Sequence, residues 1–119
     1  MADVFSMMDI PEMVAPSTTK VQPLEQARDV SGYDRIDLAI DTPGVAPTSV
    51  RILTSMTLQP DDALWVEAAA TSSAPSNNSA NAFLTVPASG KPLFRYIRWE
   101  MTAGANTVTA RITGMARRA

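Results

Sequence analysis

The chain has 119 residues, of which 45% are hydrophobic and 18% charged, a size and composition that suit one globular domain with its own core. It contains no cysteine and no histidine, which excludes disulfides, thiolate nucleophiles, histidine bases and the usual transition-metal sites. The net charge of −2 gives no basic field for nucleic acid, and no apolar run is long enough for a signal sequence or a membrane span.

The first 22 residues differ in character from the rest of the chain. They hold four of the seven methionines, and Pro11 and Pro16 stop any helix from extending. The segment is too apolar for an ordinary disordered tail, and flexible methionines suit irregular apolar grooves. Two interpretations stay open: a mobile terminus, or an arm that lies on its own sandwich or on a neighbour. We predict an extended arm over residues 1–22 and a sandwich domain over residues 23–119.

From residue 24 onward the chain has the pattern of short strands separated by turns. Alternating hydrophobic residues predict strands over 33–41, 49–58, 64–70, 82–86, 92–101 and 106–115. Gly, Pro, Asn and Asp mark the turns, and residues 71–81 have the composition of a long polar loop. The helix-like run 25–29 is too short to stand alone. The pattern predicts an all-β fold, an antiparallel sandwich or barrel, with the strand order left open.

The stretch 94–101, FRYIRWEM, places two arginines among aromatic and aliphatic residues. Alternation assigns Ile97, Trp99 and Met101 to the core, after an opening Arg95. The opposite face consists of Phe94, Tyr96, Arg98 and Glu100. We interpret it as a polar outer ladder whose charges meet opposite charges on neighbouring strands. A sugar- or anion-binding patch and an oligomer interface are the alternatives.

The carboxylates give no pattern that predicts a reaction. Asp37 and Asp41 lie on one strand face about 13 Å apart, too far for a glycosidase pair. Asp61 and Asp62 lie on a turn and offer at most a weak calcium site. No phosphate-binding loop, nucleophile elbow or zinc spacing occurs. We therefore expect no enzyme activity, no cofactor and no metal.

The C-terminal stretch 93–118, LFRYIRWEMTAGANTVTARITGMARR, resembles the closing strands of discoidin-like, galactose-binding-type jelly rolls. This resemblance implies a jelly-roll-like β-sandwich and, in that family, sugar binding. The whole chain also resembles the small accessory structural proteins of tailed bacteriophages. The likeness lies in a short, cysteine-free, Ala- and Thr-rich β-sandwich with an apolar, proline-punctuated first segment. It implies a capsid decoration (cement) protein or a small head or tail component.

We expect a non-enzymatic virion structural protein, assembled in the host cytoplasm, that decorates a phage capsid in many copies. Its expected partners are the major capsid protein or other virion subunits and further copies of itself, with neither nucleic acid nor membrane. The candidate partner-binding residues are Val4, Phe5, Met7, Met8, Ile10, Met13, Tyr96, Arg98, Arg117 and Arg118. One alternative is a carbohydrate-binding module with Trp65 or Tyr96 as a stacking platform beside the 71–81 loop. The other is an oligomeric scaffold without a ligand.

Overall fold

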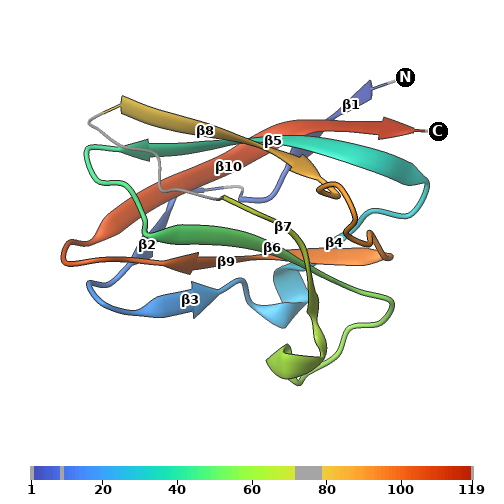
Figure 1. The fold of residues 1–119 in the computed structure, drawn as a ribbon, viewed down its shortest axis with the longest axis horizontal. Coiled ribbons are helices and arrows are strands. Elements are labelled where there is room, and N and C mark those ends of the chain that lie inside the picture. The colour runs from blue at the N-terminus through green and yellow to red at the C-terminus, as the bar shows by residue number, and fades with distance from the viewer. Residues whose placement is uncertain (1, 9, 72–78, 119) are drawn as a thin grey trace.

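Two antiparallel sheets pack face to face in the computed structural model, which describes residues 2–8, 10–71 and 79–118 (Figure 1). Sheet I contains β1 (Ala2–Ser6), β2 (Glu12–Val14), β5 (Tyr33–Pro43), β8 (Ser79–Val86) and β10 (Val108–Arg118). Sheet II contains β3 (Thr19–Val21), β4 (Arg28–Asp29), β6 (Ser49–Ser55), β7 (Val66–Ala70) and β9 (Tyr96–Thr102). Two single-turn 3₁₀ helices, η1 (Leu24–Gln26) and η2 (Asp62–Leu64), lie in the connections. The predicted all-β sandwich is confirmed.

The strand order is that of a jelly roll. β1 and β2 both pair with β10, and β3 and β4 both pair with β9, so each pair acts as one interrupted strand. Within the described residues each sheet then has four strands, in the orders β1/β2-β10-β5-β8 and β3/β4-β9-β6-β7. Every connection crosses between the sheets except the one from β6 to β7. This winding is the double Greek key of an eight-stranded jelly roll.

The first 22 residues contribute strands to both sheets. Met7 and Met8 are 1% and 4% exposed and belong to the core. The buried Gln22 side chain donates from its Nε2 to the Met7 carbonyl at 3.0 Å, and the Gln22 Oε1 accepts from the Trp99 backbone N–H at 3.2 Å. The structure therefore differs from the expected arm beside a 23–119 sandwich, because the expected boundary falls between β3 and β4, the two halves of one interrupted strand. The prolines that break a helix there also interrupt the strand, so no strand period is visible in the sequence.

The core lies between the sheets and is built from the alternating residues of the long strands. The assignment of Ile97, Trp99 and Met101 to the core is confirmed. On β5 and β10 the buried residues follow the alternation: Ile36, Leu38, Ile40, Thr42, Val108, Ala110, Ile112 and Ala116. Trp99 buries on the order of 200 Å², worth at most about 4–6 kcal/mol.

The structure differs from the predicted elements mainly at their ends. β6 ends at Ser55, and residues 56–65 form a loop that contains η2. Residues 79–81, predicted as part of a loop, belong to β8, and the rest of that predicted loop, 72–78, lies outside the described residues. No helix in the part of the chain that the structure describes is long and apolar enough to cross a membrane.

Candidate interaction surfaces

Asp37, Asp61 and Asp62 each have a structural partner. Asp61 caps η2, because its Oδ1 accepts from the Ala63 N–H at 3.0 Å. The Asp37 carboxylate accepts hydrogen bonds from Arg35, Arg117 and Thr85 on the outer face of sheet I. The described residues contain no group of three or more acidic, His or Cys side chains that could hold a metal. Their buried side-chain nitrogens and oxygens all have hydrogen-bond partners.

Arg98 is the centre of a buried polar cluster on the outer side of sheet II. It is only 4% exposed, and its Nε and Nη2 donate to the Gln22 carbonyl at 3.0 and 2.6 Å. Its Nη1 donates to Asp62 at 2.7 Å, and its guanidinium lies 5.0 Å from the centre of the Trp65 ring. The Trp65 indole N–H in turn donates to the Gln59 carbonyl at 2.9 Å. These contacts hold the loop 56–65 against the sheet.

The expectation that Arg98 faces water or a partner is wrong. Strand alternation correctly turns Arg98 away from the core, but the loop carrying η2 folds back over that face and covers it. The same cover leaves Trp65 5% exposed, so its ring faces are not open to a sugar. Tyr96 is half-buried, with the Arg95 guanidinium 5.0 Å from its ring centre.

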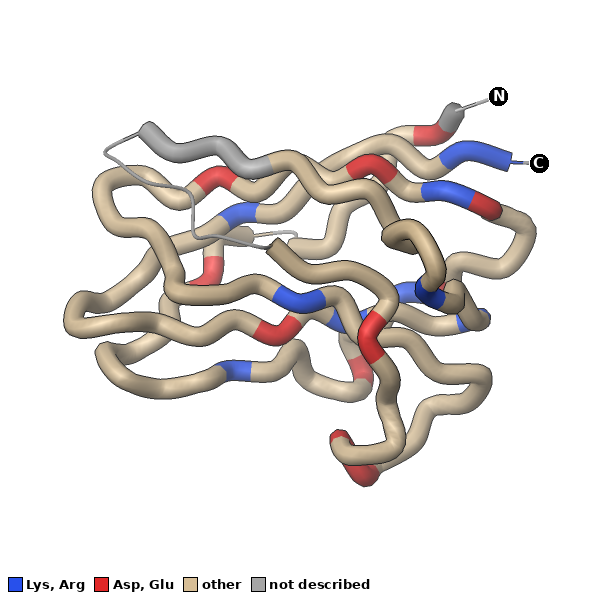
Figure 2. Tube along the Cα trace, viewed as in Figure 1, with Lys and Arg blue, Asp and Glu red and all other residues tan. Residues whose placement is uncertain are grey.

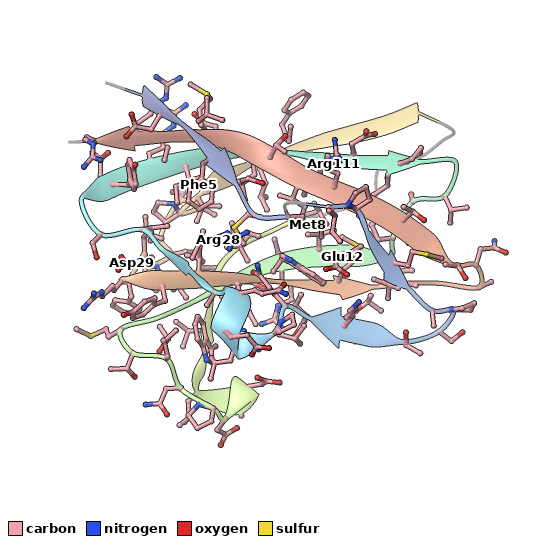
Figure 3. All side chains as sticks on the ribbon, turned by 180° about the vertical axis from the view of Figure 1, so that it is seen from behind. Phe5, Met8, Glu12, Arg28, Asp29 and Arg111 are labelled. Atoms are coloured by element: carbon pink, nitrogen blue, oxygen red, sulfur yellow. The ribbon has the colours of Figure 1, made fainter. Side chains whose placement is uncertain are left out.

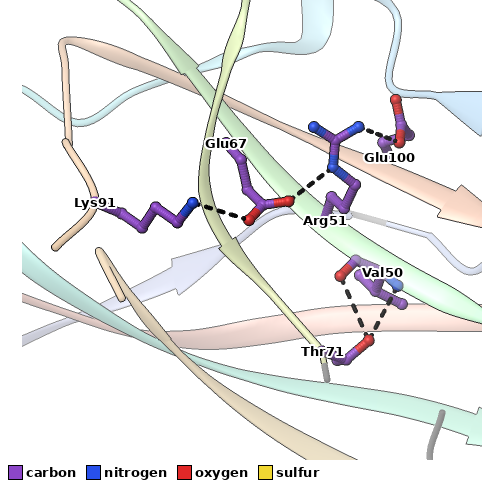
Figure 4. Close-up of polar contacts among 6 residues, drawn as sticks. All are labelled: Val50, Arg51, Glu67, Thr71, Lys91 and Glu100. Atoms are coloured by element: carbon purple, nitrogen blue, oxygen red, sulfur yellow. Dashed lines mark hydrogen bonds and ion pairs between the residues drawn. The ribbon is translucent and has the colours of Figure 1, made fainter. Parts of the chain in front are cut away.

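The rest of the outer face of sheet II carries a ladder of alternating charges (Figure 4). Arg51 on β6 donates to Glu67 on β7 at 3.0 Å and to Glu100 on β9 at 2.9 Å. Lys91 approaches the second oxygen of Glu67 at 3.5 Å. The predicted pairing of Glu100 with a charge on a neighbouring strand is confirmed. These charges neutralise one another, so the ladder explains this face without a charged ligand.

A cleft of about 260 Å³ opens at the two strand interruptions, among Met8, Glu12 and Arg28 (Figure 3). Arg28 crosses it, and its Nε donates to the Ser6 carbonyl at 2.8 Å while its Nη1 donates to the Gln26 carbonyl at 3.3 Å. The cleft is thus spanned by contacts that join the end of β1 to β4.

Exposed large hydrophobic side chains form three groups among the described residues. The loop-end patch lies at one end of the sandwich and consists of Met56, Leu58, Leu64, Val66 and Phe94. The sheet-face patch lies on the outer face of sheet I and consists of Val4, Phe83 and Met115. Two further side chains, Ile10 and Met13, lie on the N-terminal segment.

Two adjoining hollows, of about 320 and 480 Å³, mark the loop-end patch, and Met56 and Phe94 line both. The patch combines the 56–65 loop, the start of β7 and the connection that leads into β9. Met56, Leu64, Val66 and Phe94 come from separate parts of the chain and together line one hollow, and Leu58 lies on the same loop. These side chains are therefore grouped and not scattered single exposures.

The predicted partner-binding residues divide into three groups. Five are exposed: Val4, Ile10, Met13, Arg117 and Arg118. Two are half-buried, Phe5 and Tyr96, and three are buried, Met7, Met8 and Arg98. Val4 and Arg117 lie together on the outer face of sheet I, whereas Arg118 pairs with Asp3 at 3.3 Å and lies over the Tyr33 ring at 4.6 Å.

Sequence reasoning missed Phe83 and the loop-end patch. A signal for Phe83 was present, because Leu84 and Val86 alternate inward in the same strand and so place Phe83 outward. The loop-end patch had no such signal, since loop residues carry no period. No protein-family model matches the chain, and no curated protein matches it significantly.

Proposed function

We propose that the chain is a non-enzymatic structural subunit that decorates a larger assembly in many copies. In its most specific form this is a cement protein on the capsid of a tailed bacteriophage, bound to the major capsid protein or to other virion subunits. The observation that carries the proposal is the loop-end patch: five large hydrophobic side chains exposed on one end of a small domain.

A patch of this kind suits attachment to a protein surface. Monomeric proteins rarely expose contiguous apolar areas above about 300–600 Å², and such areas usually mark contacts. The patch also contains methionine and an aromatic residue, Met56 and Phe94, which are enriched in interface cores. Around a closed shell, many copies of one modest contact give a stable coat through their number and do not need high affinity at each site.

The N-terminal segment contributes differently from the arm expected from the sequence. Met7 and Met8 are buried in the chain's own core and hold the segment there. Of its exposed large hydrophobic side chains, Val4 belongs to the sheet-face patch, and Ile10 and Met13 are available to a neighbour. We therefore assign attachment first to the loop-end patch and give the segment a minor part.

Sedimentation with particles tests this proposal. Particles from a phage-producing culture of the source organism are banded on a density gradient, and the chain is followed by mass spectrometry alongside the major capsid protein. We expect the 12.7 kDa chain to band with the particles. A chain found only in the low-mass fractions would refute the proposal.

Two matched variants then test which surface attaches, by adding purified protein to particles stripped of it. Met56→Ser is expected to abolish rebinding, whereas Met13→Ser, which changes the same residue type at similar exposure (69% and 62%), is expected to leave it intact. The reverse result would assign attachment to the N-terminal segment. Circular dichroism spectra identical to wild type control for folding. The alternative carbohydrate-binding function loses Trp65 as its platform because that ring is buried.

A further inference from the structure

The outer face of sheet I is an open β-sheet surface that none of the described segments covers. Alternation turns Val4, Met115, Ala39 and Phe83 outward from four adjacent strands, β1, β10, β5 and β8. Phe83 is 80% exposed, although it lies in the middle of a strand rather than on a loop. An exposed aromatic side chain on a rigid strand buries its large apolar surface when it inserts into a complementary groove.

A groove of this kind lies beside Phe83 on the same face of sheet I. A groove of about 390 Å³ runs between Phe83 and Met115, with Ala39 and Gly114 along its floor. Gly114 lets β10 approach β5 closely, because a Cβ at this position would collide with the Asp37 carbonyl of the neighbouring strand. The groove therefore forms where β10 approaches β5 closely at Gly114 and the outward side chain of Ala39 is small.

The charges of this face are mixed at both ends (Figure 2). At the end near the chain termini, two arginines surround one aspartate: Arg35 lies 3.0 Å and Arg117 3.2 Å from Asp37. At the other end Arg111 is opposite Asp41 in the strand register. Asp3, which pairs with Arg118, and Asp34, whose charge acts on Arg35, balance the remaining positive charge at the first end. Neither end therefore carries a net charge that would make two copies of this face repel.

We propose that this face binds the same face of a second copy, so that each Phe83 enters the partner's groove in a two-fold symmetric dimer. A two-fold interface requires a surface complementary to itself, and a knob beside a hollow of suitable size meets that requirement. We place the two-fold axis across the strands, so that opposite ends of the two copies lie together.

The available area is close to what a specific dimer needs. β5 has 11 residues and so extends over about 36 Å. Four strands spaced about 4.8 Å apart give a width of about 19 Å and a face of about 700 Å². Specific interfaces bury about 800 Å² per partner, so a dimer must use nearly the whole face together with its rim. This inference goes beyond the proposed attachment, because it concerns the free protein and a different surface.

Analytical ultracentrifugation of the full chain over a range of concentrations tests the dimer. We expect a species of twice the 12.7 kDa monomer mass, and Phe83→Ser is expected to weaken dimerisation at least about 30-fold, as loss of a central aromatic anchor does. The matched control is Phe94→Ser in the loop-end patch, which is expected to leave the dimer intact. A monomeric wild type at millimolar concentration, or a dimer lost in Phe94→Ser and kept in Phe83→Ser, would overturn the inference.

A crosslinking measurement gives an independent answer if Phe83→Ser proves poorly folded. The chain has no cysteine, so Thr85→Cys introduces a single thiol beside the groove. A short bismaleimide is expected to join this variant into a covalent dimer, and to leave a Met56→Cys variant monomeric. Crosslinking of Met56→Cys alone would place the contact at the loop end instead. Neither result depends on particle attachment, so the two proposals fail separately.

Discussion

Replacement of Arg98 by methionine tests whether the buried cluster on sheet II holds the 56–65 loop in place. Methionine keeps much of the side-chain volume and removes the guanidinium. The buried Gln22 carbonyl then loses two donors, at 3.0 and 2.6 Å, and the Trp65 ring loses its cation. Loss of hydrogen bonds to a charged group costs about 1.5–3 kcal/mol, and loss of a desolvated cation–π contact up to about 2.

These terms predict that Arg98→Met lowers the free energy of unfolding by about 2–5 kcal/mol. The ion pair with Asp62 contributes little to this total, because the Asp62 side chain is 59% exposed. Asp62→Asn is therefore expected to cost less than about 1 kcal/mol. The cost comes from the unpaired buried carbonyl and not from the loss of the salt bridge itself.

Urea unfolding followed by tryptophan fluorescence measures both variants, since Trp65 and Trp99 flank the site. The slope of the transition should stay unchanged while the midpoint shifts. If the free energy of unfolding of Arg98→Met lies within about 1 kcal/mol of the wild-type value, the cluster does not hold the loop. Equal costs for the two variants would mean that the ion pair is the main interaction, contrary to the reasoning from exposure.

Three further predictions follow from the fold. Deletion of residues 2–21 removes β1, β2 and β3 and opens the core at Met7, so the truncated chain is expected to lose cooperative thermal unfolding in circular dichroism; a cooperative melt would show that the segment is dispensable. Gly114→Ala is expected to cost about 1–3 kcal/mol in urea unfolding because the new Cβ meets the Asp37 carbonyl, whereas Thr113→Ala at the exposed neighbour is expected to cost under about 0.5. The hydrogen bond from Arg35 lowers the pKa of Asp37 below its ordinary value of 3.8, so the stability it contributes is complete above pH 3.8 and is lost as the pH falls through the folded-state pKa. Asp37→Asn should therefore flatten the acid limb of stability against pH, and an unchanged acid limb would contradict the assignment.

The sheets of the domain were predictable wherever a strand is long and half-buried. β5 and β10 show strict alternation, and their buried residues are the ones that alternation assigns; β9 follows the same rule except at Arg98. Alternation identifies the face of the sheet on which a side chain lies, but it does not show whether a loop covers that face. This is why Arg98 was predicted to lie on an open outer face and to bind a partner, although it does turn away from the core. The loop that buries it is held by single contacts, such as Asp62 and Trp65, which leave no periodic trace.

The N-terminal strands were missed for a different reason. β2 and β3 have three residues each, and β4 has two, too few for a period to be recognised. Their pairing is decided by β10 and β9, between 67 and 98 residues away in the chain, and this non-local pairing also fixes the strand order. Met7 and Met8 looked suited to a foreign groove because the groove they fill, in their own core, exists only after those distant strands have assembled.

The two proposed surfaces together predict a cement-like action. A dimer joined through sheet I with opposite ends together carries its two loop-end patches at opposite ends, and so can bridge two neighbouring sites on a shell. The second attachment is then intramolecular and strengthens binding by about 10²–10⁴-fold where the sites have the right spacing. Phe83→Ser should accordingly reduce the occupancy of stripped particles at low protein concentration but restore it at high concentration, whereas Met56→Ser should prevent binding at both. Unchanged occupancy of Phe83→Ser at every concentration would show that the chain attaches as single copies, and bridging would then play no part in decoration.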